Sequence, residues 1–158
     1  MLLPEASFVD VGAWIGPTSL YAAALGANVT AFECDPTALE HLRENISVNP
    51  DLAPRIKVIP AGLAAEDGPF TLHSTNWGNS ESTVFPIVER KRTAELLTKS
   101  VEVEGLSICQ ALEPTGSKIQ VALIKIDVEG AEYNLLSALG DEIGQANCAF
   151  YISFHPRT

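Results

Sequence analysis

Glycine and acidic residues follow several apolar runs of the sequence, at positions where a strand turns into a helix. Gly12 directly follows the apolar run at residues 7–11, and Gly16 lies four residues further on. Glycine adopts backbone conformations closed to other residues and lets a ligand approach the main chain. The first amide groups of the following helix have no partner within that helix. We therefore predict a ligand-binding turn at residues 12–16.

The spacing of these glycines argues against the usual dinucleotide fingerprint. That pattern places glycines at the first, third and sixth positions, whereas this sequence has Gly12, Trp14 and Pro17 there. A nicotinamide-dependent dehydrogenase is therefore disfavoured. Glu33 ends the next apolar run, about 20 residues after Gly12, where a carboxylate can accept hydrogen bonds from ribose hydroxyls. The alternative is that Glu33 is simply a polar strand end.

The elements that must position these groups alternate between apolar strands and amphipathic helices. This alternation is typical of βαβ units, so we predict an α/β fold with a doubly wound, Rossmann-like, mainly parallel sheet. Pro17 and Pro36 suit the first turn of a helix, Asp35 suits an N-cap, and Gly26 suits a helix end. The expected core strands lie at residues 7–11, 28–32, 56–59, 121–126 and 148–154.

Two of the expected helices carry an apolar stripe that would face the sheet. Leu39, Leu42 and Ile46 recur at helical spacing after Pro36. A second stripe at residues 131, 135 and 139 predicts a helix that stops at Gly140. Both helices are expected to pack on the parallel sheet.

One edge of this sheet is expected to gather the chemically active residues. Ligands bind beyond the carboxyl ends of parallel strands, where the strand order reverses. Glycine or acidic junctions close four of the expected strands, at Gly12, Glu33, residues 62–63 and Asp127. We therefore expect these four junctions to face one crevice.

The alternation of strands and helices lapses in the middle of the chain. Trp77 lies in a stretch rich in serine, asparagine and glycine, where it either stacks on a substrate or packs against its own domain. The expected elements of this region are an exposed strand at 70–73, a loop at 74–83, a helix at 87–97, an edge strand at 101–104 and a short helix around 106–112.

The composition favours one globular domain and excludes some partners. The 158 residues suit a single domain with its own core. A formal net charge of −10 with ten Lys and Arg argues against a nucleic-acid partner. The sequence shows neither an apolar run of membrane-spanning length nor a signal-peptide pattern, so we expect a cytoplasmic chain without a membrane partner. Cys34, Cys109 and Cys148 lack metal-site spacing, which favours reduced thiols.

Five ordered segments resemble motifs of the FkbM family, a family of class I S-adenosyl-L-methionine (SAM) methyltransferases. The most specific is residues 124–132, a full match to its Ile-Lys-Ile-Asp-Val-Glu-Gly-Ala-Glu signature. Residues 10–16 resemble its Asp-Val-Gly-Ala-x-Ile-Gly motif. Residues 31–36 resemble Ala-Phe-Glu-Pro-x-Pro, with Cys34 where proline is usual. Weaker resemblances at residues 42–49 and 61–68 extend the similarity over nearly the whole chain.

The resemblance implies methyl transfer from SAM to a hydroxyl group of a small molecule, sugar or polyketide. It places one group of residues around the methionine part of SAM, Glu33 at the ribose, and Gly62 and Leu63 at the adenine. Trp14 and Cys34, beside these motif positions, and Asp127 are further expected cofactor contacts. The residues expected around the methionine part are Asp10, Gly12, Ala13 and Gly16.

The candidates for the catalytic step, which removes the acceptor hydroxyl proton, are Asp127, Glu129 and His155. Asp127 either acts as that base or only caps the next helix or holds the amino group of SAM. Glu129 and Glu132 either face the crevice or favour the helix N-terminus. His155 is a base near neutral pH or a structural residue. Lys125 either reaches solvent or pairs with an acid.

A metal on Asp127, Glu129 and Glu132 would lack a complete ligand set, so we expect none. Residues 104–107 replace the family's usual Thr-Leu-Asp, which puts any role for that acid in doubt. The chain is expected to lack the last two strands of the class I sheet, as if truncated after the fifth core strand. The alternative function is therefore a catalytically degenerate SAM-binding domain or partner subunit. The sheet edges left open would favour a homo-oligomer.

Overall fold

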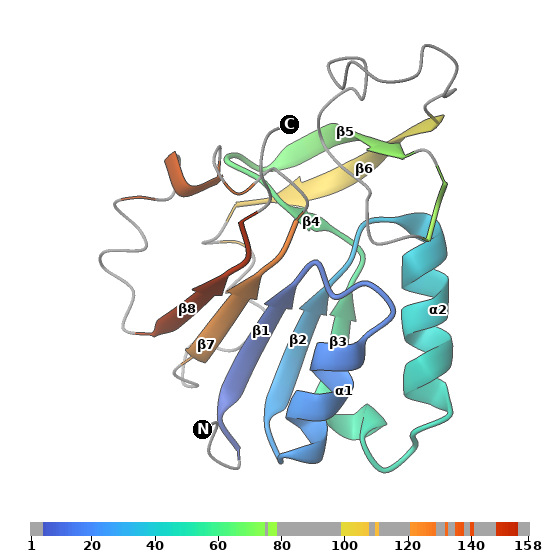
Figure 1. The fold of residues 1–158 in the computed structure, drawn as a ribbon, viewed down its shortest axis with the longest axis vertical. Coiled ribbons are helices and arrows are strands. Elements are labelled where there is room, and N and C mark those ends of the chain that lie inside the picture. Colours follow the sequence, from blue (N-terminus) through green and yellow to red (C-terminus); the bar gives the residue numbers. More distant parts are fainter. Residues whose placement is uncertain are drawn as a thin grey trace.

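The computed structural model shows two sheets, a five-stranded parallel sheet and a smaller three-stranded one (Figure 1). It describes residues 5–74, 76–78, 99–107, 110, 121–128, 132, 135–137, 140 and 148–154. The elements in chain order are β1 (Ser7–Val11), α1 (Pro17–Ala24), β2 (Asn28–Phe32), α2 (Pro36–Ser47), a 3-10 turn (Ala53–Arg55), β3 (Ile56–Ile59), β4 (Gly62–Leu63), β5 (Gly68–Ser74), β6 (Lys99–Leu106), β7 (Val121–Ile126) and β8 (Ala149–Ile152).

The larger sheet has the strand order β3-β2-β1-β7-β8, and every neighbouring pair in it is parallel. The chain moves from β1 through β2 to β3 in one direction, and β7 and β8 extend the sheet on the other side of β1. The strand order therefore reverses between β1 and β7, which makes their carboxyl ends the expected ligand-binding edge. The prediction of a doubly wound α/β fold is confirmed.

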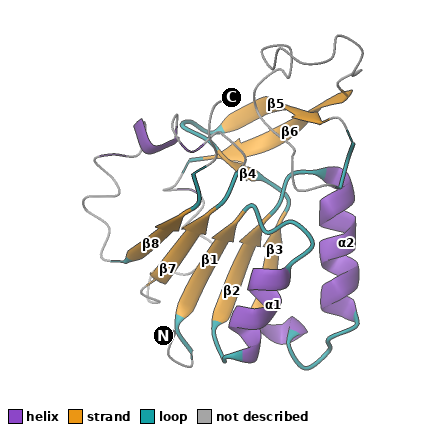
Figure 2. Ribbon diagram, viewed as in Figure 1, coloured by secondary structure: helices purple, strands orange, loops and turns teal. Residues whose placement is uncertain are grey.

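Alternating side chains of the strands build a core on each face of this sheet. Phe8 of β1 packs with residues of α1 and α2, whereas Val9 packs on the opposite face with Leu135. The same alternation occurs in β2, because Ala31 belongs to the first cluster and Phe32 to the second. Figure 2 shows α1 and α2 side by side over the β1–β3 half of the sheet.

The predicted helix boundaries of α1 and α2 are confirmed, and the residues at their ends explain them. Pro17 is the first residue of α1, and Gly26 closes it with a φ of 91°. The N–H of Gly26 donates to the Ala23 carbonyl (2.9 Å) and that of Ala27 to the Ala22 carbonyl (3.1 Å), as in a Schellman cap.

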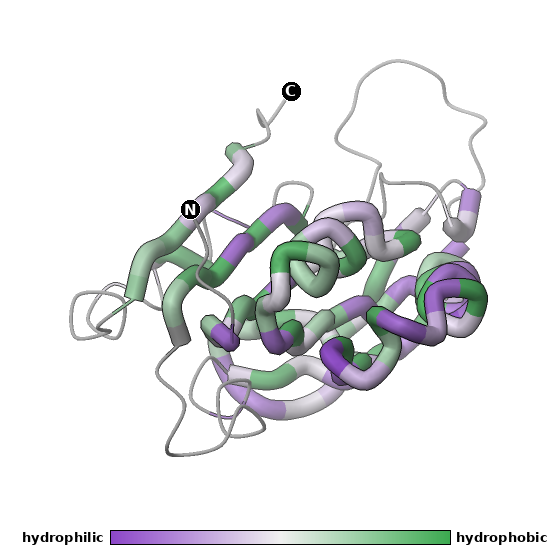
Figure 3. Tube along the Cα trace, turned by 90° about the horizontal axis from the view of Figure 1, so that it is seen from below, coloured by the Kyte–Doolittle hydropathy of each residue, from purple (hydrophilic) through white to green (hydrophobic). Residues whose placement is uncertain are grey.

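Asp35 caps α2 as predicted, because its carboxylate accepts the N–H groups of Thr37 (2.9 Å) and Ala38 (3.0 Å). Leu42 is fully buried, and Leu39 and Ile46 pack beside it, which confirms the predicted apolar stripe. In Figure 3, α2, at the right, carries both hydrophilic and hydrophobic residues around its turns, as an amphipathic helix does.

The smaller sheet lies beyond the carboxyl ends of the parallel strands (Figure 1) and has the order β4-β6-β5. The strand predicted at residues 101–104 is therefore the centre of a sheet rather than an edge. Its second neighbour, β4, has two residues, too few to show any alternation in the sequence. The helix expected from residue 106 also begins too early, because Leu106 ends β6. The helix expected at 87–97 lies outside the described residues.

The C-terminal elements agree in part with their predictions. Strand β7 has the predicted bounds, and β8 is shorter than the expected run at 148–154. Residues 135–137 are helical, and Gly140 is itself helical rather than the residue that follows the end of a helix. None of the helices in the described ranges is long and apolar enough to span a membrane.

Candidate functional site

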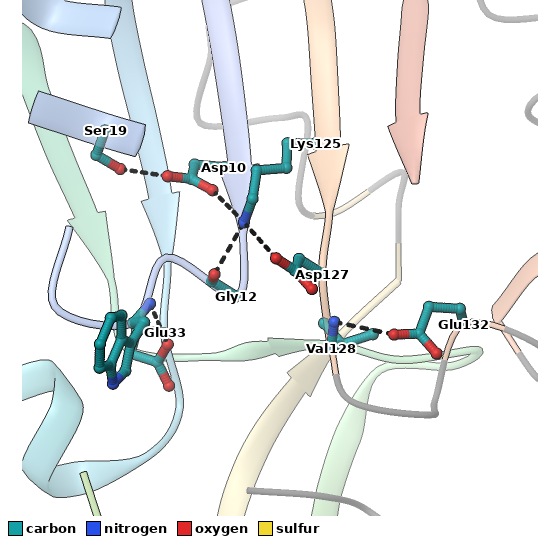
Figure 4. A network of polar contacts seen from close by, with 9 residues as sticks. Asp10, Gly12, Ser19, Glu33, Lys125, Asp127, Val128 and Glu132 are labelled. Atoms are coloured by element: carbon teal, nitrogen blue, oxygen red, sulfur yellow. Dashed lines mark hydrogen bonds and ion pairs between the residues drawn. The ribbon is translucent and has the colours of Figure 1, made fainter. Parts of the chain in front are cut away.

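The predicted junctions meet at the carboxyl ends of β1, β2 and β7 (Figure 4). Gly12 follows β1, Glu33 follows β2 and Asp127 follows β7. The turns after β1 and β7 are hydrogen-bonded, because the Asp127 N–H donates to the Val11 carbonyl (3.1 Å). These residues therefore surround the point where the strand order reverses.

Gly12 has a backbone conformation and surroundings that require glycine. Its φ is +74°, and a Cβ at this position would overlap the Asp127 carbonyl oxygen. The N–H groups of Gly12 and Ala13 both donate to the Phe32 carbonyl, at 3.1 and 3.0 Å. The glycine turn is thus fixed against both β2 and β7.

Gly16 and Gly62 are also needed for close packing. A Cβ at Gly16 would lie 2.6 Å from the Leu42 Cδ1 atom, so glycine lets the turn approach α2. A Cβ at Gly62 would lie 3.2 Å from the Cys34 sulfur, which shows that these two expected cofactor contacts are neighbours. The side chain of Leu63 is buried in the core cluster with Phe32.

A charged network connects β1, β7 and α1. Asp10 is completely buried, and Lys125 lies opposite it in the register of β1 and β7. The Lys125 ammonium donates to Asp10 Oδ1 (3.0 Å) and to the Gly12 carbonyl (3.1 Å) and lies 3.6 Å from Asp127 Oδ2. The Ser19 hydroxyl donates to Asp10 Oδ2 (2.7 Å). Lys125 therefore pairs with an acid, which was one of the two alternatives for this residue.

Replacing Lys125 with methionine is expected to lower the free energy of unfolding by about 3 kcal/mol, because it leaves the buried Asp10 charge without its cation. Urea denaturation of the two proteins measures this difference. Lys99→Met is the matched control, since Lys99 is exposed on β6 and its loss should change the stability by less than about 0.5 kcal/mol. Equal stabilities for wild type and Lys125→Met would show that this network does not stabilise the fold.

Glu33 is a buried carboxylate held by three backbone N–H groups. Its Oε1 atom accepts from Cys34 (2.8 Å) and Asp35 (2.7 Å), and its Oε2 atom accepts from Trp14 (2.7 Å). A carboxylate offers about four lone-pair sites, so one on Oε2 remains for a ligand hydroxyl. Burial raises the pKa of the Glu33 carboxyl above its ordinary 4.5; the Asp35 charge adds to this rise, and the three N–H bonds oppose it.

Cys34 follows Glu33 directly, and its thiol is largely buried. Burial raises the pKa of Cys34 to about 12, and the charges of Glu33 and Asp35 add to the rise. At neutral pH the group therefore stays a protonated thiol, so it serves as a small packing group rather than a nucleophile.

A contact between the glycine turn and the segment after β5 was not foreseen from the sequence. Trp14 has a φ of 52°, and its indole N–H donates to the Gly78 carbonyl (2.9 Å). The Gly78 N–H donates in turn to the Asp35 carboxylate, 3.1 Å from Oδ1. Sequence patterns carry little signal for such a contact, because it joins residues 64 positions apart through one side chain and one backbone carbonyl.

The catalytic candidates have different outcomes. Asp127 is partly exposed and lies beside Lys125 at the strand reversal. Glu132 is fully buried and accepts the Val128 N–H (3.3 Å), so it stabilises the turn after β7 instead of facing an open crevice. Glu129 and His155 lie outside the described residues. Within the described ranges, potential metal ligands do not form groups of three or more.

Comparisons with known proteins identify the family. The family model described as "Methyltransferase FkbM domain" matches residues 10–156. The Methyltransferase sdnD of Sordaria araneosa is 31% identical over 164 residues, and the match covers 89% of this chain and 63% of that protein.

Among solved structures, Methyltransferase FkbM from Methylobacillus flagellatus KT shares the fold with a TM-score of 0.60 at 18% identity. The match covers 97% of this chain and 34% of that one. The chain thus spans less than two thirds of the length of either protein. The chain belongs to the FkbM methyltransferase domain family.

Proposed function

We propose that this chain binds SAM at the carboxyl ends of β1, β2 and β7 and methylates a hydroxyl oxygen of a small molecule or glycan. The observation that carries the proposal is the placement of the glycine turn, Glu33 and Asp127 at the strand reversal of an FkbM-family fold. In α/β sheets this is the position where ligands bind.

The arrangement of donors and acceptors fits the adenosine part of SAM. Glu33 keeps one acceptor site for a ribose hydroxyl, and three N–H bonds fix the direction of its carboxylate. Gly62 lies next to Cys34, so the junctions after β2 and β3 form one wall that would flank the adenine. Ala13 and Gly16 complete the turn expected at the methionine part.

The charges fit the sulfonium part of SAM, which supplies the methyl group when the cofactor is bound. Asp10 and Asp127 carry two negative charges and Lys125 carries one positive charge, so the network has a net charge of −1. A negative network attracts a cation at low dielectric more strongly than in water. The same network would bind the neutral product, S-adenosylhomocysteine, less tightly.

Asp127 is the residue we assign to the acceptor hydroxyl. Its side chain is 35% exposed, so an acceptor can reach it, and its Oδ2 atom lies 3.6 Å from the Lys125 ammonium. A carboxylate here would orient the hydroxyl and accept its proton as the new carbon–oxygen bond forms. His155 and Glu129 remain candidates for the same step.

Asp127→Asn is expected to lower the rate of methyl transfer by about 100-fold or more, because the amide cannot accept the proton. The assay follows the labelled methyl group of SAM into a panel of monosaccharides and polyketide alcohols, and calorimetry measures SAM binding. Asp51→Asn, in an exposed turn, is the matched control and should keep the wild-type rate.

The outcomes separate the proposal from its alternative. If the folded wild-type chain does not bind SAM, the proposed function is wrong. SAM binding without methyl incorporation into any acceptor would support a catalytically degenerate domain or partner subunit. Unchanged turnover in Asp127→Asn would show that Asp127 is not the catalytic base and would leave His155 and Glu129 as the candidates.

A further inference from the structure

Three segments that are distant in the sequence meet at one point beside the proposed cofactor site. Trp14 belongs to the glycine turn, Asp35 follows β2 by three residues, and Gly78 follows β5. The indole N–H of Trp14 and the carboxylate of Asp35 bind the carbonyl and the N–H of Gly78, respectively. We propose that residues 76–78 form a further wall of the SAM site, and that Trp14 is the positioning residue that clamps this wall.

On one side of the clamp, Gly78 is hydrogen-bonded to Asp35 and packs closely against the start of α2. The same Asp35 carboxylate that caps α2 accepts the Gly78 N–H, at 3.1 Å from Oδ1 and 3.2 Å from Oδ2. Gly78 has a φ of +84°, and a Cβ on it would lie 2.8 Å from the Thr37 Cγ2 atom. A side chain at position 78 would therefore be both strained and crowded, so glycine lets this residue lie close against the start of α2.

On the other side of the clamp, Trp14 connects residues 76–78 to the Glu33 carboxylate, which binds the ribose in our proposal. The backbone N–H of Trp14 donates to Glu33 Oε2, the oxygen with the remaining acceptor site. Its φ of 52° is uncommon for a residue with a large side chain, and this backbone is retained where surrounding contacts hold it. Both the indole bond to Gly78 and the N–H bond to Glu33 hold it.

The clamp therefore couples the wall to cofactor affinity. Release of Gly78 frees the Trp14 side chain, and relaxation of Trp14 moves the N–H that orients Glu33. We expect a cofactor to bind tightly only while the indole is bound to Gly78. This inference rests on the proposed function, because it concerns how the same site holds SAM.

Trp14→Phe keeps an aromatic ring but removes the indole donor, so it tests this coupling directly. We expect its Kd for S-adenosylhomocysteine to rise about fivefold, the value of one hydrogen bond, through faster dissociation. The free energy of unfolding should change little, because Trp14 is 36% exposed. Tyr21→Phe, exposed on α1, is the matched control and should bind as the wild type does.

Gly78→Ala breaks the same clamp from its other side and should raise the Kd by a similar factor. If both residues act through one contact, the Kd of the double variant will be no higher than the larger of the two single-variant Kd values. Calorimetry measures the affinity, and stopped-flow tryptophan fluorescence, to which Trp77 contributes in every variant, measures the dissociation rate. An unchanged Kd in Trp14→Phe, or effects of the two variants that add, would overturn the clamp while leaving the proposed function intact.

A wild-type chain that does not bind S-adenosylhomocysteine would overturn both proposals together. Binding by the wild type that is lost in Glu33→Gln but unaffected in Trp14→Phe and Gly78→Ala would support the SAM site and reject residues 76–78 as one of its walls. The two failures are thus distinguishable in one set of titrations.

Discussion

Gly12→Ala is expected to abolish SAM binding and to lower the free energy of unfolding by about 3 kcal/mol or more. The added Cβ would overlap the Asp127 carbonyl oxygen, and the φ of +74° is unfavourable for alanine. Because the Gly12 carbonyl also accepts from Lys125, a shift of the turn would disturb the charged network. Thermal unfolding and SAM titration measure the two effects.

Two other glycines serve as controls for this experiment. Gly140 is helical and has open space around it, so Gly140→Ala should stabilise the chain by about 0.5–1 kcal/mol. Gly68 has a φ of +135°, but an added Cβ would contact no other atom. Gly68→Ala therefore measures the cost of backbone strain alone, without a steric overlap of the new side chain. A Gly12→Ala chain as stable and as tight-binding as the wild type would contradict the geometry of the β1 turn.

The second large effect concerns Glu33. Glu33→Gln is expected to weaken SAM binding by about 50-fold, because the amide replaces a charged acceptor and directs an NH2 group at backbone N–H donors. The wild-type affinity should increase as the pH rises through the raised pKa of Glu33, because the charged form accepts the ribose hydroxyl most strongly. Titration at several pH values should show that this dependence is absent in Glu33→Gln.

The same pKa shift predicts the sign of a stability change. The folded chain holds the Glu33 proton more tightly than the unfolded chain, so Glu33 contributes most favourably below pH 4.5. Its contribution to the free energy of unfolding decreases as the pH rises from 4.5 through the raised pKa. Urea denaturation of wild type and Glu33→Gln across this range measures the difference. Glu40→Gln, exposed on α2, should show no such trend, and a difference of the opposite sign would contradict the buried position of Glu33.

The parallel sheet was predictable from the sequence because its signals are local. Short, mainly apolar runs mark β1, β2, β3 and β7. The residues that begin or end α1 and α2 act within one helical turn. The gathering of Gly12, Glu33 and Asp127 follows from this topology, since parallel strands present their carboxyl ends at one edge.

The features that could not be predicted from the sequence depend on contacts between distant residues, which leave no pattern in the local sequence. The central position of β6 depends on β4, a two-residue strand that is visible only once the chain has folded. The choice between solvent and an acid for Lys125 was decided by the register that places it opposite Asp10. The bond from Trp14 to Gly78 requires a left-handed backbone at a tryptophan, for which the sequence has no reliable sign.

The pairing of β1 with β7 has a consequence for the order of folding. The Asp10–Lys125 bond joins residues 115 positions apart, whereas β1, β2 and β3 pair over much shorter separations along the chain. Closing so long a loop is entropically costly, so the β1–β3 half should form first and the β1–β7 contact late. During synthesis on a ribosome, Lys125 and Asp127 also emerge long after β1–β3. Under the proposed function, a growing chain therefore cannot complete its SAM site until the segment with Lys125 and Asp127 has emerged.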